Sequence, residues 1–183
     1  MVMMFKLFSR ILFYKFLNWK ITGRFPSYPK YIIAVVPHTS WLDFLLGLLV
    51  RSISNEQINF LGKKELFSPL TAWFFRGLGG APIDRSGKQG SVEAITAIFN
   101  AHDKFRIALA PEGTRKKVKK LRTGYYHIAK NLKIPIVPVA FDYKNKKVII
   151  HPVFYTTKDE TKDLVALEKL FKGVKGFSKE KSF

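Results

Sequence analysis

The sequence predicts an α/β protein built as a single domain, in which helices flank a mostly parallel central sheet. Short apolar runs that suit buried strands alternate along the chain with segments of helical period. The polar residues that could carry chemistry come directly after such runs, where open α/β sheets place their functional sites. With 183 residues, of which 47% are hydrophobic, the chain is long enough for one domain with a substantial core.

Residues 1–22 are predicted to form an amphipathic helix at a membrane interface. Basic residues interrupt this segment too often for a membrane-spanning helix or the core of a signal peptide. One face of a helical wheel carries apolar side chains, namely Phe5, Phe8, Leu12, Phe16 and Trp19. Such a stripe also fits a helix packed on the protein's own core. The aromatic content and the flanking lysines favour the lipid interface.

The middle of the chain, residues 23–172, is predicted to form the α/β domain itself. After a connector that contains two prolines, apolar runs predict strands at 31–36, 58–61, 81–83, 105–110, 134–141 and 148–151. The segments between them predict helices at 40–52, 68–75, 91–101 and 125–132, and a last helix after Thr157. The second of these helices opens with Ser-Pro, a cap followed by a first-turn proline.

Local signals mark three further boundaries. Thr39 or Ser40 is expected to cap the helix that follows the first apolar strand. Thr157 and Glu160 have the spacing of a capping box for the last helix. Residues 173–183 are basic and contain glycine, so we expect a frayed tail there.

Charge and cysteine content limit the kinds of function. The chain has 32 lysine and arginine residues against 13 acidic residues, a net charge of +19, which predicts a polyanionic partner such as membrane lipid, nucleic acid or a phosphorylated substrate. The aromatic residues cluster in apolar segments and no usual nucleic-acid-binding motif is present, so we predict no nucleic-acid partner. The absence of cysteine excludes disulfides, thiolate metal sites and a cysteine nucleophile.

His38 and Asp43 are the first candidate catalytic residues. Five residues apart in a regular helix, their side chains would lie about 140° apart and could not share a face. If His38 lies in the turn after strand 31–36 and Asp43 in the first helical turn, the carboxylate can reach back to the imidazole. A histidine held in this way presents its other ring nitrogen as a general base, able to take a proton from an alcohol.

Arg85 and Arg115 are candidates for binding an anion. Arg85 follows the glycine-rich loop GGAPID, and Arg115 follows the Gly113 turn. Two arginines and a glycine turn after neighbouring strands predict a site of phosphate size, although Arg85 alone could be a solvated residue paired with Asp84. Glu112 is expected to orient Arg115 or a substrate hydroxyl. A metal is not predicted there, since no second carboxylate or histidine lies nearby in sequence.

Four segments of the chain resemble, in order and spacing, the successive motifs of the glycerolipid acyltransferase family, which includes the lysophosphatidic acid acyltransferases. They span residues 31–141 and are His38-X4-Asp43, Ile83-Asp84-Arg85, Pro111-Glu112-Gly113-Thr114-Arg115 and Ile134-Pro135-Ile136-Val137-Pro138. Lys63, in the sequence KKEL, and the residues 122–124 also resemble family features. The chain departs from the common pattern at Pro37, before the histidine, and at Lys116, after the arginine.

The resemblance implies transfer of a fatty acyl group from acyl-CoA or acyl carrier protein to a hydroxyl of a lysophospholipid, such as 1-acylglycerol-3-phosphate, in phospholipid biosynthesis. His38 would be the base and Asp43 its partner, with no cofactor and no metal. Substrate binding would fall to Arg85, Glu112, Gly113, Thr114, Arg115 and Lys63.

The sequence leaves alternatives for the acceptor and for the partners. Glycerol-3-phosphate and lyso-ornithine or lyso-glycine lipids are other possible acceptors, and a lipid-binding or nucleic-acid-binding protein without catalysis is a remote alternative. The basic segment 115–122 would hold anionic lipid or receive an acidic carrier protein. We expect a peripheral, monotopic protein on the cytoplasmic face of the cell membrane.

Overall fold

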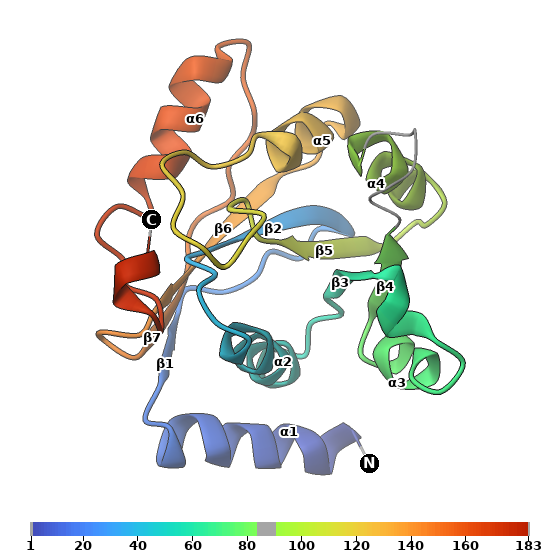
Figure 1. Cartoon of the computed structure of the whole chain (residues 1–183), viewed down its shortest axis with the longest axis vertical. Helices are drawn as coiled ribbons and strands as arrows, with labels where there is room; N and C mark the ends of the chain where they lie inside the picture. Colours follow the sequence, from blue (N-terminus) through green and yellow to red (C-terminus); the bar gives the residue numbers. More distant parts are fainter. Residues whose placement is uncertain (1, 84–90, 183) are drawn as a thin grey trace.

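The computed structural model describes residues 2–83 and 91–182 of the chain. Within these ranges the strands form one seven-stranded sheet in the order β1-β7-β6-β2-β5-β3-β4, with helices on both faces (Figure 1). Neighbouring strands run parallel except for β6 and β7, which are antiparallel. The predicted α/β class with a mostly parallel sheet is therefore confirmed.

The strands and helices lie close to the ranges that the apolar pattern predicts. The strands are β1 (Lys20–Thr22), β2 (Lys30–Val36), β3 (Asn59–Lys63), β4 (Gly80–Ile83), β5 (Phe105–Leu109), β6 (Ile136–Asp142) and β7 (Lys147–Ile150). The α-helices are α1 (Val2–Arg10), α2 (Leu42–Ser54), α3 (Ala72–Gly77), α4 (Ser91–Asn100), α5 (Gly124–Leu132) and α6 (Glu160–Lys169). Shorter helical segments are the π-helix η1 (Ile11–Phe16) and the 3-10 helices η2 (Lys64–Phe67) and η3 (Lys179–Lys181).

The centre of the sheet is buried on both faces. Ile32 of β2 lies between Ile107 of β5 and Ile136 of β6, and all three side chains are fully buried. One apolar core lies between the sheet and the helices α4, α5 and α6, and the other lies between the sheet and α2 with η1. Burial on both faces explains why these strands are continuous apolar runs in the sequence and do not alternate.

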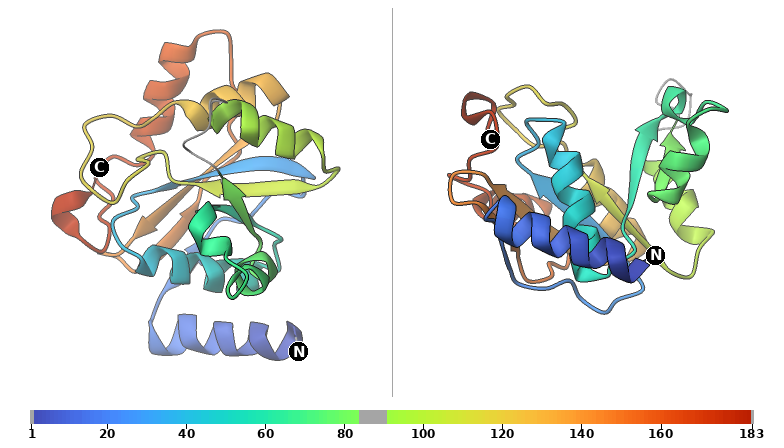
Figure 2. Two further views of the ribbon diagram at one scale, coloured as in Figure 1. Left: turned by 45° about the vertical axis from the view of Figure 1, so that its right-hand side comes forward. Right: turned by 90° about the horizontal axis from the view of Figure 1, so that it is seen from below.

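On one side of the centre of the sheet, β3 pairs with β5 over only part of its length. β3 pairs with β5 at Asn59 and Phe60, whereas the rest of β3 pairs with β4. In Figure 2 the β3–β4 pair, together with α3, stands apart from the main body of the sheet. The carboxyl ends of β5 and β3 are therefore not joined by a ladder.

The N-terminal helix is shorter than the sequence predicts. Helical structure ends at Phe16, Asn18 adopts a left-handed conformation with φ of 56°, and β1 then pairs with β7. The expected apolar face is also divided, because Trp19 is 7% exposed whereas Phe16 is 77% exposed. The prediction of a helix through residue 22 is wrong beyond Phe16, and residues 20–22 belong to the sheet. No helix in the described ranges is long and apolar enough to cross a bilayer.

The C-terminal residues are packed, so the prediction of a frayed tail is wrong for 173–182. The Ser178 amide donates a hydrogen bond to Thr39 Oγ1 at 3.2 Å, and the Gly176 amide donates to Ser182 Oγ at 2.9 Å. A Cβ atom at Gly176 would lie 2.6 Å from Thr39 Oγ1, so this close approach requires glycine. The tail thus lies against the loop that follows β2.

The last helix begins differently from the prediction. Asp159 is the N-cap of α6 and accepts a hydrogen bond from the Lys162 amide at 3.1 Å. Thr157 instead donates its hydroxyl to Asp163 at 2.9 Å. Thr156, Thr157 and Asp159 all carry side-chain oxygens before this helix, and Asp159, the nearest to its first turn, serves as the cap.

Candidate active site

His38 and Asp43 meet where β2 leads into α2. His38 lies in the loop after the strand, and its Nδ1 is 3.2 Å from Asp43 Oδ2. The same carboxylate oxygen accepts hydrogen bonds from the amides of Thr39 and Ser40, each at 2.8 Å. Asp43 therefore closes the loop onto the first turn of α2, and the Ser40 hydroxyl accepts a hydrogen bond from the Leu42 amide at 3.2 Å, as expected of a cap at Ser40.

Asp43 is a buried carboxylate that keeps its charge. Its side chain is 1% exposed. Burial on its own would raise the pKa of Asp43, but hydrogen bonds from His38, from the Tyr143 hydroxyl and from the Ser40 amide outweigh burial and hold the pKa below its usual range. The Tyr143 hydroxyl donates to Asp43 Oδ1 at 2.7 Å. Nothing in the local sequence pairs Tyr143 with Asp43, and sequence reasoning missed it.

Glu112 supports the backbone of the same loop. It follows β5, is 2% exposed, and accepts a hydrogen bond from the His38 amide through Oε2. Its other oxygen, Oε1, is buried and has no hydrogen-bond partner among the described residues. The described ranges contain no ion pair between Glu112 and Arg115. The structure therefore places Glu112 beside His38.

Glu112 should make stability depend on pH. Burial raises the pKa of Glu112 from 4.5 to about 7, and the His38 amide opposes this only in part. The folded state thus favours the protonated acid. The contribution of Glu112 to the free energy of unfolding is therefore fully present below pH 4.5 and is lost as pH rises through about 7. Relative to Glu112→Gln, wild type should lose on the order of 3 kcal/mol of unfolding free energy between those limits, measured by chemical denaturation.

The matched control for this experiment is Glu93→Gln, which changes an exposed glutamate on α4. That variant should keep the wild-type dependence of stability on pH. If Glu112→Gln also kept it, the buried carboxyl group would not be titrating in this range.

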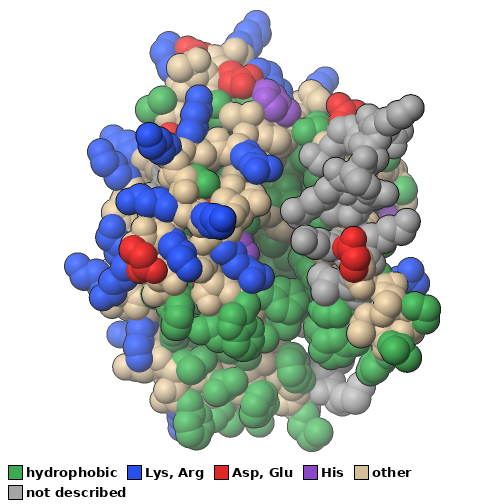
Figure 3. All heavy atoms as spheres, in the orientation of Figure 1, with side chains coloured by type: hydrophobic (Ala, Val, Ile, Leu, Met, Phe, Trp, Pro, Cys, Tyr) green, Lys and Arg blue, Asp and Glu red, His purple; other side chains and the backbone are tan. Residues whose placement is uncertain are grey.

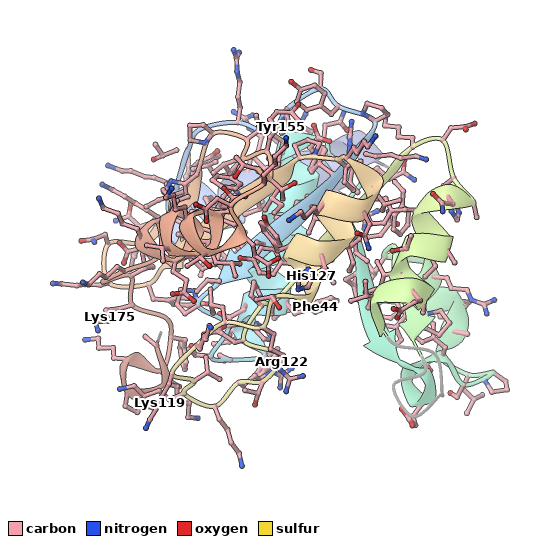
Figure 4. The ribbon with its side chains drawn as sticks, turned by 90° about the horizontal axis from the view of Figure 1, so that it is seen from above. Phe44, Lys119, Arg122, His127, Tyr155 and Lys175 are labelled. Atoms are coloured by element: carbon pink, nitrogen blue, oxygen red, sulfur yellow. The ribbon has the colours of Figure 1, made fainter. Side chains whose placement is uncertain are left out.

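Residues 113–122 form the loop that faces His38 across the end of the sheet. Gly113 has φ of 63° and its amide donates to the Ala110 carbonyl at 2.9 Å. A Cβ atom at Gly113 would lie 2.7 Å from Nε of Arg122, which packs over this turn. Arg122 is labelled in Figure 4 and comes from the stretch just before α5. The turn requires glycine both for its conformation and for the approach of Arg122.

The other predicted site residues are placed as follows. Thr114 and Arg115 lie in the same loop, where the Thr114 hydroxyl accepts a hydrogen bond from the Lys116 amide at 3.2 Å and Arg115 is exposed. Arg85 lies outside the described residues. Lys63 ends β3, and its side chain also lies outside the description. The structure thus brings together the His38 pair, Glu112 and the 113–115 loop.

A cavity of about 920 Å³ opens beside His38. Its polar rim includes His38, Thr114, Arg115 and Arg122, and its apolar lining comes from α2, β3, α3, α4 and α5, for example Phe44, Leu48, Phe60, Phe75 and Ile95. The lining includes residues from both faces of the sheet, as the incomplete pairing of β5 with β3 allows. In Figure 3 hydrophobic side chains fill the hollow at the centre of this face.

Lysine and arginine side chains gather on one side of this hollow (Figure 3). The exposed lysines of the loop before α5 are Lys116, Lys117, Lys119 and Lys120. Figure 4 shows Lys119 and Lys175 on the same side of the molecule, so the packed tail adds its charge to that of the loop. Among the described residues no cluster of three histidine, aspartate or glutamate side chains could hold a metal ion.

The fold and the site define an α/β protein that holds a histidine–carboxylate pair at the rim of a large apolar cavity. The chain belongs to the Acyltransferase family, whose model matches residues 19–142. The matched residues include His38, Asp43 and 112–115, which the structure brings together. The family that the sequence motifs resemble is therefore confirmed.

This chain matches curated relatives at moderate sequence identity and over only part of their length. The chain is 31% identical over 147 residues to a protein of Saccharomyces cerevisiae named 1-acyl-sn-glycerol-3-phosphate acyltransferase, covering 75% of this chain and 46% of that protein. A protein of Salmonella typhimurium with the same name is 33% identical over 94 residues, covering 48% of this chain and 38% of the relative. The chain thus spans less than half the length of these relatives.

A solved structure has the same fold. It is the 1-acyl-sn-glycerophosphate (LPA) acyltransferase PlsC from Thermotoga maritima, which aligns with a TM-score of 0.65 and 20% sequence identity over 92% of this chain and 76% of that one. At this identity the likeness shows the arrangement of sheet and helices.

Proposed function

We propose that this protein transfers a fatty acyl group from a thioester, on coenzyme A or acyl carrier protein, to the hydroxyl of a lysophospholipid, 1-acylglycerol-3-phosphate, in phospholipid biosynthesis. The names of the curated relatives support this acceptor. The observation that carries the proposal is the position of the His38–Asp43 pair at the rim of an apolar cavity of about 920 Å³. That volume lies near the upper end of the range of small-molecule pockets, about 300–1,000 Å³.

The geometry supports a general-base mechanism. With Nδ1 of His38 donating to the ionised Asp43, Nε2 is free to accept the proton of the acceptor hydroxyl. The hydroxyl oxygen then attacks the thioester carbonyl to form a tetrahedral intermediate. Its collapse breaks the C–S bond, and the leaving thiolate takes the proton from the imidazolium. Asp43 stabilises the ring while it carries that proton.

The two parts of the cavity suit the two parts of the substrates. The apolar lining would receive the acyl chain, while the rim carries the guanidinium groups of Arg115 and Arg122. Guanidinium groups bind phosphate through two hydrogen bonds at once. We place the acceptor phosphate there, with Arg85 and Lys63 as further candidates. A carboxylate of a lyso-amino-acid lipid would suit the same groups, and the acyl-transfer assay offers both kinds of acceptor side by side.

The proposed partners follow from the exposed surface. We propose that the protein sits peripherally on the cytoplasmic face of the cell membrane through its N-terminal helix, whose exposed side chains include Phe5, Phe8 and Phe16. The basic side chains around the loop before α5 would attract anionic lipid or an acidic acyl carrier protein.

An acyl-transfer assay read by mass spectrometry tests the proposed function. Wild type would be offered an acyl thioester on each carrier with lysophosphatidate, glycerol-3-phosphate and lyso-ornithine lipid side by side. We expect the diacylated product from lysophosphatidate. Product from a different acceptor alone would replace the proposed substrate, and no product from any acceptor with a folded protein would contradict the proposed activity.

Arg115→Ala should weaken the use of a charged acceptor. Loss of one guanidinium contact to phosphate at this exposed position should lower kcat/KM for lysophosphatidate roughly tenfold. Transfer to monoacylglycerol, which has no phosphate, should change little in the same variant. Lys169→Ala, which removes the charge of an exposed lysine on α6 that does not line the cavity, is the control. Equal losses with both acceptors would place the phosphate elsewhere.

A further inference from the structure

Asp43 is held at both of its carboxylate oxygens. Oδ2 faces His38 and the amides of Thr39 and Ser40, which all belong to the loop after β2. Oδ1 accepts its hydrogen bond from Tyr143, which is distant in sequence and follows β6. A carboxylate fixed at one oxygen by its own loop can still rotate or shift, whereas a second anchor from a different strand of the sheet fixes its orientation.

Tyr143 is itself held by residues from the N-terminal segment and from the C-terminal tail. Its ring meets the ring of Trp19 edge to face at 4.8 Å between centroids and that of Phe177 at 5.7 Å. Its amide donates to the carbonyl of Lys175 at 2.8 Å. Trp19 in turn lies 6.2 Å from Phe13, the fully buried ring of η1. A continuous series of contacts therefore joins the N-terminal helix and the C-terminal tail to Asp43.

We propose that Tyr143 is a positioning residue for the His38–Asp43 pair, and that Trp19 and Phe177 hold its ring so that its hydroxyl stays on Asp43. The inference rests on the proposed function, in which this pair supplies the base. Tyr143 is not among the residues that line the cavity. Its effect on the reaction would therefore pass through Asp43, and substrate binding should be nearly independent of it.

The hydroxyl is suited to act as a permanent donor. Burial, together with the hydrogen bond to the charged Asp43, raises the pKa of Tyr143 far above its ordinary value, so the group keeps its proton at any working pH. The titratable groups that face Asp43 are His38, Glu112 and Tyr143. Without the phenol, Oδ1 would be left buried without this donor, and more of the carboxylate charge would act on the imidazole.

Tyr143→Phe tests the inference because it removes the hydroxyl and keeps the ring. With a hydrogen bond to a charged group lost, we expect kcat for acyl transfer to fall roughly 10- to 100-fold, while KM for the acceptor stays within about twofold. Because an imidazole beside a more concentrated negative charge keeps its proton to higher pH, the acidic limb of kcat/KM should also move to higher pH.

The chain provides a matched control in Tyr126→Phe. The Tyr126 hydroxyl donates to Asp163 at 2.8 Å, so this variant also removes a buried bond from tyrosine to aspartate, between α5 and α6. Its kcat and pH profile should match wild type. If Tyr143→Phe also matched wild type, or if its kcat fell with no shift of the acidic limb, the positioning role would be overturned.

A second variant tests the support of the ring. Phe177 is 55% exposed, so Phe177→Ala should fold, and it should reduce kcat in the same direction as Tyr143→Phe but by less. In the double variant the two effects should not add, because both act through the same hydroxyl. Additive losses would show that Phe177 does not act through Tyr143.

An NMR titration separates failure of this inference from failure of the proposed function. The His38 ring resonances, assigned by comparison with His38→Ala, can be followed against pH without any substrate. In Tyr143→Phe their titration midpoint should lie at higher pH than in wild type even if none of the tested acceptors is used. Identical midpoints would overturn the inference while leaving an observed transferase activity intact.

Discussion

His38→Ala should lower kcat for acyl transfer by about 10²- to 10⁴-fold, the range that a positioned general base contributes. The reason is geometric, since the ring is fixed by Asp43 at one nitrogen and faces the cavity with the other. The fold should be retained because the His38 side chain is 25% exposed and the loop is held independently by the amide bonds to Asp43 and Glu112. The measurement is the initial rate with saturating thioester and lysophosphatidate.

Two further variants make this result specific. His38→Gln retains an amide that could reach Asp43 but supplies no base, so it should be as inactive as His38→Ala. His127→Ala changes a half-exposed histidine on α5, labelled in Figure 4, and should be fully active. Wild-type rates in His38→Ala with unaltered circular dichroism would remove the base assignment and with it the mechanism proposed above.

The His38–Asp43 pair could be predicted from sequence because its determinants are local. A continuous apolar run identifies the buried strand β2, and the helix after it begins within six residues of the strand's end. The chain between them is too short for Asp43 to lie far from His38. The same reasoning placed Glu112 and residues 113–115 at the end of β5, next to β2 in the sheet.

The parts of the site that sequence reasoning missed depend on packing between distant segments. Tyr143 lies 100 residues from Asp43, and only the pairing of β6 with β2 brings the two side chains together. The tail was expected to fray because of its lysines and glycines, but Gly176 is the feature that lets it approach Thr39 closely. A glycine in a basic segment can indicate either a frayed tail or a close packing contact, and only the tertiary contact distinguishes the two.

The N-terminal helix shows a similar limit. A helical wheel treats all apolar positions alike, so the sequence left a lipid interface and a packed helix as alternatives. The structure buries Phe13 and Trp19 in the core beneath α2 and leaves Phe5, Phe8 and Phe16 exposed. The left-handed Asn18 ends the helical path before Trp19, and no hydrophobic pattern reveals its backbone conformation.

The exposed side chains of α1 should bind lipid, and replacing two of them should show it. Phe5 and Phe8 are 53% and 58% exposed, and at the same end of the molecule α3 exposes Trp73 and Phe74 (Figures 1 and 3). Two phenylalanine rings that enter the acyl region of a bilayer contribute about 3 kcal/mol together. Phe5→Ser combined with Phe8→Ser should therefore weaken binding to anionic vesicles roughly a hundredfold, measured by vesicle sedimentation.

The control for the membrane prediction lies at the opposite end of the fold. Val165 is 62% exposed on α6, which Figure 1 shows far from α1, and Val165→Ser should leave vesicle binding unchanged. Basic residues on the N-terminal helix, Lys6 and Arg10, should add a salt-dependent part to the binding that the phenylalanine changes leave in place. Undiminished sedimentation of the Phe5→Ser, Phe8→Ser protein would exclude this face as the contact with the bilayer, and the cavity would then have to receive its lipid from another direction.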